Sequence, residues 1–243
     1  QTIKLLEVCR MRKTPVITFI NKMDREVREP LELIDEIEDI LGMSCAPITW
    51  PIGMGKDFAG VFDLASKRML KFTPGEDRPE THLEVLEGED NPYIVEHFPI
   101  AHATFKEEVE IVREAAEPFD HEAFLAGGLS PVFFGSAINN FGVRDILQAL
   151  EAWAPSPRRR EARQRTISPE EETFTGIVFK IQANMNPLHR DRIAFVRVCS
   201  GTYRQGLKAQ HVRSGKPIRL DHAITFMAQE RAHLASAYAG DII

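Results

Sequence analysis

The chain has 243 residues, of which 43% are hydrophobic and 27% are charged, and its formal net charge is -6 at pH 7. This composition is typical of an ordinary globular protein and excludes disordered and collagen-like chains. No apolar run approaches the roughly 20 residues that span a bilayer, so we expect a cytoplasmic protein with no membrane partner. The three cysteines are scattered, which fits free thiols better than disulfides or a metal site.

The charge divides unevenly along the chain. Residues 1–153 hold 15 basic and 28 acidic side chains, whereas residues 154–243 hold 15 basic and 8 acidic side chains. This asymmetry predicts two domains with different partners. The chain starts at Gln1, inside its first helical pattern, so we expect a fragment of a longer protein.

The first part of the chain alternates helix and strand patterns. Apolar residues from Ile3 to Met11 follow helical spacing, and the apolar run Pro15–Ile20 is typical of a strand buried on both faces. Pro30 and Gly42 bound an amphipathic helix. Short apolar pieces with many glycines and prolines then predict an inserted subdomain at about 47–115.

The second part differs in pattern. Pro131–Gly135 is another buried-strand pattern, and the helical pattern from Val143 to Leu150 closes the first domain. Residues 154–172 read as a charged linker without periodicity, and residues 173–243 as short alternating strands separated by turns that contain glycine. The predicted fold is therefore a partial α/β sheet in residues 1–153, of the type found in P-loop GTPases and carrying the insert, followed by an all-β barrel.

A polar motif follows the first buried strand, where an open α/β sheet has its ligand crevice. It consists of Asn21, Lys22, Met23 and Asp24. The Asp24 carboxylate can accept hydrogen bonds from guanine N1–H and the exocyclic amine, whereas adenine presents an acceptor at N1. Lys22 can cover the base with its aliphatic stem, and the Asn21 amide can bridge to a base edge or a neighbouring loop. The alternative is a polar loop that caps the next helix.

A turn of small residues follows the second buried strand at Gly135, Ser136 and Ala137. Such a turn lets backbone N–H groups approach a carbonyl such as guanine O6. If the two buried strands are parallel neighbours, both polar segments lie at one edge of the sheet. The turn alone could be a simple strand-to-helix connection, but together the segments predict a site for GTP or GDP.

Hydrolysis of GTP also requires a phosphate-binding loop and an Asp-x-x-Gly segment that positions Mg²⁺ and water. Gly53–Lys56 lacks the upstream glycine and the following Ser or Thr, and Asp57–Gly60 lies after the guanine motif, in the wrong order. We read both as turns of the insert. The sequence therefore predicts no catalytic residue and no metal site in this chain, and we expect the phosphate half and the Mg²⁺ ligands upstream of Gln1.

Two basic segments are candidates for contact with RNA. His189, Arg190 and Arg192 fall between the first two strands of the predicted barrel, where such folds meet nucleic acid, although a salt-bridged hairpin tip is the alternative. The arginines from Arg158 to Arg165 read more readily as a solvated linker than as an RNA contact.

The polar segments resemble the fourth and fifth guanine-nucleotide motifs of the translation-factor GTPases, over essentially the whole chain. The residues that carry this resemblance are Asn21–Asp24, Gly135–Ala137 and Asn140–Val143. Cys45–Gly53 and the stretch from Phe179 to Phe195 are similar to the branch of that family that acts in translation termination.

The resemblance implies roles for these residues and partners for the protein. Asn21, Lys22 and Asp24 would select guanine, with support from Ser136 and Ala137. The longer protein would be a monomeric, Mg²⁺-dependent GTPase that binds ribosomal RNA and promotes the departure of class I release factors, without a DNA partner. Alternatives are a translocase like elongation factor G and a non-catalytic RNA-binding module.

Overall fold

The computed structural model describes residues 2–73, 84–183, 192–221, 223–227 and 230–243. The chain divides into two compact units, Gln1–Ala154 (unit 1) and Pro155–Ile243 (unit 2). Within the described ranges, no helix combines the length and apolar character needed to cross a membrane.

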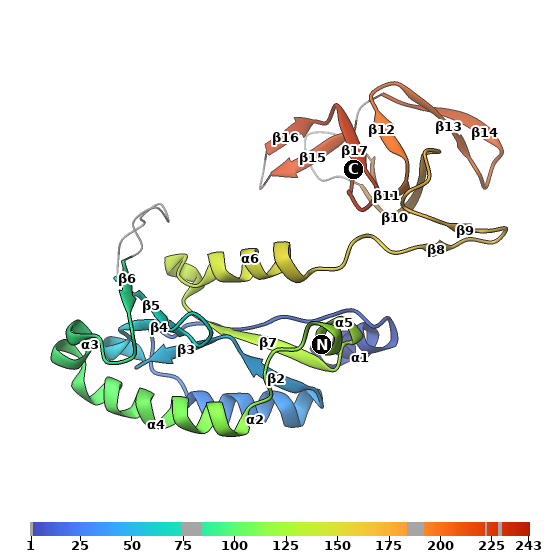
Figure 1. Ribbon diagram of the computed structural model, residues 1–243. Helices are drawn as coiled ribbons and strands as arrows, with labels where there is room; N and C mark the ends of the chain where they lie inside the picture. The colour runs from blue at the N-terminus through green and yellow to red at the C-terminus, as the bar shows by residue number, and fades with distance from the viewer. Residues whose placement is uncertain (1, 74–83, 184–191, 222, 228–229) are drawn as a thin grey trace. The chain divides into compact units, whose positions relative to one another are not determined.

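The centre of unit 1 is a parallel sheet with strand order β1-β7-β2 (Figure 1). Strand β1 (Thr18–Ile20) and strand β7 (Leu129–Phe134) form where the sequence predicts buried strands. Strand β2 (Ser44–Pro47) is not predicted, because it has neither a β-branched run nor alternation. Every residue of β7 is buried, as expected for the central strand of a sheet covered on both faces.

Helices cover both faces of this sheet. Helix α2 (Pro30–Leu41) begins at proline and ends at Gly42, whose left-handed φ of 55° lets its N–H bond to the Glu38 carbonyl. Figure 1 shows α2 along one face, and α6 (Val143–Trp153) along the other. The remaining sheet-flanking helices are α1 (Thr2–Met11) and α5 (His121–Ala126).

The segment between β2 and α5 folds mainly as a four-stranded antiparallel sheet, followed by two helices. Its elements are β3 (Thr49–Ile52), η1 (Gly55–Asp57), β4 (Gly60–Asp63), β5 (Arg68–Lys71), β6 (Val85–Glu87), α3 (Pro92–His97) and α4 (Pro99–Ala115). Trp50, Phe62 and Phe105 are almost completely buried and form its core. The bounds of about 47–115 for an insert stay a prediction.

Unit 2 is built from antiparallel strand pairs. Its elements are β8 (Arg160–Glu161), β9 (Thr166–Ile167), β10 (Thr175–Ala183), β11 (Arg192–Ser200), β12 (Thr202–Arg204), β13 (Leu207–His211), β14 (Lys216–Leu220), β15 (Ile224–Met227), β16 (Glu230–His233) and β17 (Ser236–Tyr238). Backbone bonds between Val196 and Ile243 add the chain end to the edge of β11. A small core forms around the fully buried side chains of Val198, Tyr203 and Ala237.

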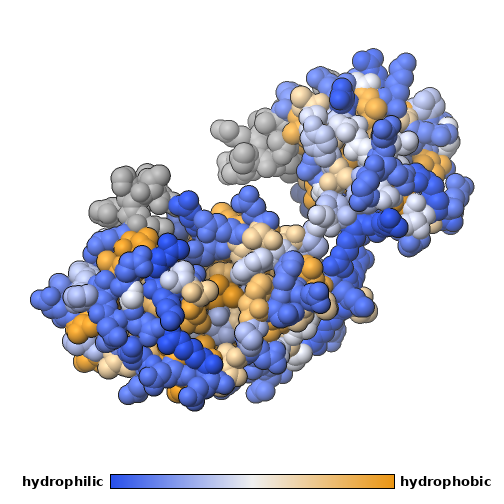
Figure 2. Space-filling view, viewed as in Figure 1, coloured by the Kyte–Doolittle hydropathy of each residue, from blue (hydrophilic) through white to orange (hydrophobic). Residues whose placement is uncertain are grey.

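The segment over residues 154–172, which the sequence predicts as a charged linker, contains a short hairpin that its pattern does not indicate. Strands β8 and β9 pair antiparallel within it, with Glu161 opposite Thr166. The hairpin has no apolar alternation. Side-chain hydrogen bonds accompany its pairing instead: Thr166 Oγ1 donates to Glu161, and Arg165 donates to Glu171. Figure 2 shows mainly hydrophilic residues on the visible face of unit 2.

Candidate guanine-nucleotide site

The two polar segments meet at one edge of the parallel sheet. Strands β1 and β7 are parallel neighbours, with Ile20 opposite Phe134, so their carboxyl ends lie side by side. Beyond the strands, the Gly135 N–H donates to the Ile20 carbonyl at 3.0 Å, and the Met23 N–H donates to the Gly135 carbonyl at 3.1 Å. The two turns are therefore joined through their backbones.

Burial separates the four residues of the first motif into one anchor and three surface groups. The Met23 side chain is completely buried in the core of unit 1. Asn21 and Lys22 are exposed, and Asp24 is half-buried. Lys22 has a left-handed φ of 74°, which lets the chain turn sharply between the exposed Asn21 and the buried Met23. Sequence reasoning grouped Met23 with the binding residues, but the position of its side chain makes it an anchor for the loop.

A chain of hydrogen bonds orients the Asp24 carboxylate. The buried Ser136 hydroxyl donates to Asp24 Oδ1 at 2.5 Å and accepts from Asn139 Nδ2 at 2.7 Å. A hydroxyl has a single proton to donate, so the bond from Asn139 favours the rotamer in which that proton points to Asp24. Asn139 lies in the short helix η3 (Ala137–Asn139), and sequence reasoning did not identify it.

Asn21 links the first turn to Ala137. Its Oδ1 atom accepts from the Ala137 N–H at 2.8 Å and from the Lys22 N–H at 2.8 Å. With Oδ1 engaged twice, the amide nitrogen of Asn21 is the group that can donate to a ligand. The Ala137 N–H has a protein partner here, so a base carbonyl at this position would share or replace the bond to Asn21.

Two glycines allow the second turn to close tightly. Ser136 and Phe141 exchange both of their backbone hydrogen bonds, which brings the Phe141 carbonyl over Gly135. A Cβ atom at Gly135 would lie 2.3 Å from the Phe141 oxygen and 2.9 Å from the Phe19 ring. Gly142 has a φ of +78°, and a Cβ there would lie 2.7 Å from the Phe134 oxygen. Larger residues at either position would open the turn.

The antiparallel sheet packs against both turns. The Gly55 N–H of η1 donates to the Met23 carbonyl at 2.9 Å. The Phe141 ring contacts Phe58 and Phe72, with ring centroids 5.7 and 5.2 Å away. The sequence predicts a turn at Gly53–Lys56, and the structure has the short helix η1 over Gly55–Asp57 there. Its contact with the Asn21–Asp24 motif is not predicted, because local pattern carries no signal for that pairing.

Glu108, in helix α4, carries a buried carboxyl group. Trp50 Nε1 donates to Glu108 Oε2 at 2.9 Å, and burial raises the pKa of Glu108. Glu108, together with Glu26 and Asp57, lines a cavity of about 190 Å³. The carboxylates therefore give this cavity an acidic character, and the ionised form of Glu108 is disfavoured there.

The other predicted site residues lie elsewhere. Arg192 is exposed at the start of β11, and His189 and Arg190 lie outside the described residues. Among the residues that the structure describes, no group of three or more His, Cys, Asp or Glu side chains is arranged to hold a metal ion.

Comparison with known proteins identifies the family. Residues 1–156 match the family model described as "Elongation factor Tu GTP binding domain", and residues 173–243 match "Elongation factor G domain 2". The chain belongs to the translation-factor GTPase family. This result confirms the predicted fold class, an α/β GTP-binding domain followed by a β-rich domain.

Individual relatives agree with this assignment over the full length of the chain. Peptide chain release factor 3 of Bordetella avium (strain 197N) is 55% identical over 243 residues, and that of Aromatoleum aromaticum is 56% identical over 248 residues. Both alignments cover 100% of this chain and 45% of the relative. The chain thus spans less than half the length of these curated relatives, and the resemblance to the termination branch is confirmed.

Proposed function

We propose that this chain is the guanine-reading part of a GTPase that acts in translation termination. One observation carries the binding half of this proposal: Ser136 holds the Asp24 carboxylate next to the Asn21–Ala137 pair. These groups come from two loops more than a hundred residues apart in sequence, so a simple helix cap does not explain their assembly.

The groups at this edge match the hydrogen-bonding pattern of guanine. The Asp24 carboxylate accepts from N1–H and the exocyclic amine, and the Asn21 amide and the Ala137 N–H can donate to acceptors on the opposite edge of the base. Adenine would place its N1 acceptor against the carboxylate and leave both groups without a hydrogen bond, which costs binding free energy. The aliphatic stem of the exposed Lys22 can cover one face of the ring.

Hydrolysis requires groups that these 243 residues do not supply in a credible place, namely the phosphate-binding loop and the Mg²⁺-positioning Asp-x-x-Gly. Mg²⁺, when bound in a complete site of this kind, would neutralise charge on the phosphates. We therefore expect this chain to bind the base and to show no ribosome-stimulated GTP turnover by itself. Robust turnover would contradict this assignment.

The proposed cellular role is supported by the relatives named peptide chain release factor 3, at 54–56% identity. The complete protein would promote dissociation of class I release factors from the ribosome, as a cytoplasmic monomer that cycles between GTP and GDP. The match of residues 173–243 to elongation factor G domain 2 supports a second candidate, a ribosomal translocase.

The Asp24→Asn variant tests guanine recognition. Ligand-observed NMR against GDP, ADP and xanthosine diphosphate should show a guanine preference for the wild type and a xanthine preference for the variant, because the amide donates where the carboxylate accepted. The matched control is Asp120→Asn, a helix cap on α5 whose side chain accepts from Ala123 N. A wild-type chain that does not distinguish GDP from ADP would favour the non-catalytic RNA-binding module.

A sedimentation assay separates the two ribosomal roles. The chain should pellet preferentially with ribosomes that carry a class I release factor. Preferential pelleting with ribosomes poised for translocation would support the elongation factor G-like alternative instead.

A further inference from the structure

The segment from Arg158 to Ile167, named here the arginine hairpin, is the most densely basic part of the chain. It contains Arg158, Arg159, Arg160, Arg163 and Arg165 and a single acidic residue, Glu161. All of these side chains are exposed. The hairpin lies between the two family-model matches, which end at residue 156 and begin at residue 173. Its charge is therefore a feature of this chain beyond what either match describes.

The backbone of the arginine hairpin is ordered by its own hydrogen bonds. Strands β8 and β9 pair Arg160 with Ile167 and Glu161 with Thr166 (Figure 1). The Ala162 N–H donates to the Arg165 carbonyl at 3.0 Å and closes the turn. A solvated linker would have no fixed geometry, whereas this turn holds its guanidinium groups on a defined scaffold. Less backbone entropy is then lost when a ligand binds.

Two nearby acidic groups, Glu161 and Glu171, have partners other than Arg160 and Arg163. Thr166 Oγ1 donates to both carboxylate oxygens of Glu161, at 2.9 and 3.0 Å. Glu171 accepts from Arg165 Nη1 at 2.6 Å and from the Ser168 N–H at 2.8 Å. Across the described parts of the chain, no salt bridge joins Arg160 or Arg163 to a carboxylate. These two side chains are available to an external anion.

We propose that the arginine hairpin is an RNA-binding element that contacts the phosphate backbone through Arg160 and Arg163. All five basic residues are arginine, whose planar guanidinium matches two phosphate oxygens at once, whereas lysine offers only a point charge. The surrounding charge agrees, because residues 154–243 hold 15 basic and 8 acidic side chains. The choice of RNA over another polyanion rests on the proposed ribosomal function; the charge and geometry do not depend on it.

Salt-dependent binding of a labelled single-stranded RNA tests this proposal. Each phosphate contact to single-stranded nucleic acid contributes about 0.7 to the slope of log K against log salt concentration. Arg160→Gln combined with Arg163→Gln should therefore reduce the slope by about 1.4 and weaken binding by roughly 25-fold at about 0.1 M salt. Replacing both residues with lysine should preserve most of the slope, because the charges remain.

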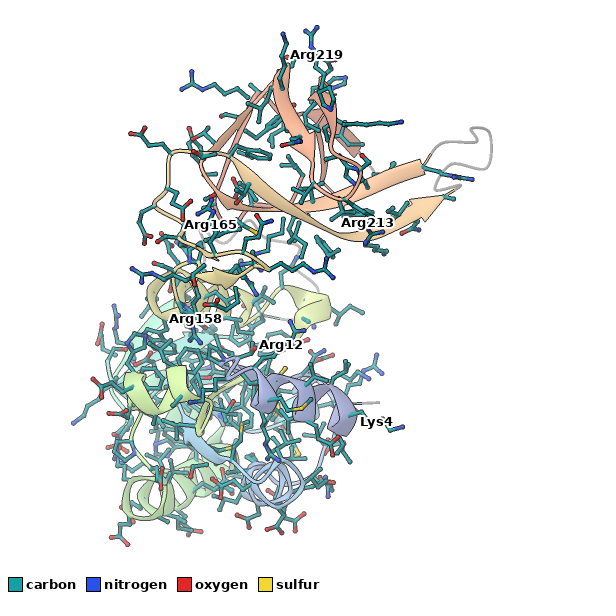
Figure 3. All side chains as sticks on the ribbon, turned by 90° about the vertical axis from the view of Figure 1, so that its right-hand side faces the viewer. Lys4, Arg12, Arg158, Arg165, Arg213 and Arg219 are labelled. Carbon is teal, nitrogen blue, oxygen red and sulfur yellow. The ribbon has the colours of Figure 1, made fainter. Side chains whose placement is uncertain are left out.

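The matched control removes two exposed positive charges from unit 1. Lys4→Gln in helix α1 with Arg12→Gln just after it changes the net charge equally, far in sequence from the hairpin. Figure 3 labels both side chains. An equal loss of RNA affinity in this control, or an unchanged slope in the hairpin variant, would overturn the proposal. So would tighter binding of the wild type to polyglutamate than to RNA, since that result would identify an acidic polypeptide as the partner.

The nucleotide preference of the same variants separates this inference from the proposed function. A guanine preference that persists while the hairpin substitutions leave RNA binding unchanged refutes the hairpin element alone. A hairpin-dependent RNA slope in a chain that does not distinguish GDP from ADP refutes guanine recognition alone.

Discussion

Ser136→Ala is the sharpest test of how Asp24 is oriented. The substitution removes the hydroxyl that donates to Asp24 Oδ1 at 2.5 Å and accepts from Asn139 Nδ2 at 2.7 Å. A hydrogen bond to a charged group contributes about 1.5–3 kcal/mol. Without this bond, the half-buried carboxylate can adopt other rotamers, and ordering it against a base then costs conformational entropy. If about half of that energy positions the carboxylate, GDP affinity should fall about 3- to 12-fold, since 1.4 kcal/mol corresponds to one decade.

Strand β7 supplies an internal control for loss of stability. Ser130, at the other end of the strand, is as completely buried as Ser136, and its hydroxyl bonds to Thr18 Oγ1 and to the Val16 carbonyl. Ser130→Ala should therefore cost about 1 kcal/mol of stability, without changing GDP affinity. Ser136→Thr retains the hydroxyl, so its GDP affinity should stay close to that of the wild type.

The assay is a titration with GDP, followed through the backbone amide signal of Ala137 by NMR, with thermal unfolding measured on the same samples. The reasoning requires weakened GDP binding in Ser136→Ala and unchanged binding in Ser130→Ala at comparable melting temperatures. Equal affinities in the two alanine variants would show that the Ser136 hydroxyl stabilises the strand without positioning Asp24.

Two further substitutions test the packing around the site. Gly135→Ala places a Cβ atom 2.3 Å from the Phe141 oxygen and should lower both stability and GDP affinity. The control Gly128→Ala, whose Cβ would lie 3.8 Å from its nearest atom, should change GDP affinity little. Equal losses of affinity in the two variants would refute the close-approach argument. Burial raises the pKa of Glu108, so its contribution to stability is greatest below the unfolded pKa and is lost as pH rises through the folded pKa. Glu108→Gln should therefore be at least as stable as the wild type at pH 7 by chemical denaturation, with the difference shrinking as the pH falls; a variant less stable at every pH would contradict this.

The residues that we propose to read guanine could be grouped from the sequence because their chemistry is local in sequence. Asn21 to Asp24 and Ser136 with Ala137 each follow an apolar run, and the ends of such strands meet at one edge when the strands are parallel neighbours. The sequence does not contain the details that depend on side-chain geometry. The Asn139 amide and the engagement of Ala137 N–H by Asn21 arise only when the two turns are brought together.

The arginine hairpin was missed for a different reason. Strand prediction relies on apolar alternation, and β8 and β9 are two residues each and almost entirely polar. Polar bonds from Thr166 to Glu161 and from Arg165 to Glu171 accompany their pairing. In composition, however, the segment resembles an ordinary charged linker. Strand β2 was missed because its four residues, Ser44–Pro47, contain neither a β-branched run nor apolar alternation.

The antiparallel sheet shares a buried core with the two turns of the proposed guanine site. A single cluster of buried residues contains Met23 and Phe141 from these turns together with Trp50, Phe62 and Phe105 from the segment at 47–115. Among the residues that the structure describes, the parallel sheet has three strands. The loops that follow β1 and β7 are also supported by the Gly55 N–H and by the rings of Phe58 and Phe72. Protein cores are close-packed and respond to the loss of a single methylene. A substitution that loosens the packing of this segment would therefore change the packing around Met23 and Phe141 first, and the residues proposed to contact the base only through them. Guanine selectivity and the stability of the segment at 47–115 are thus expected to change together.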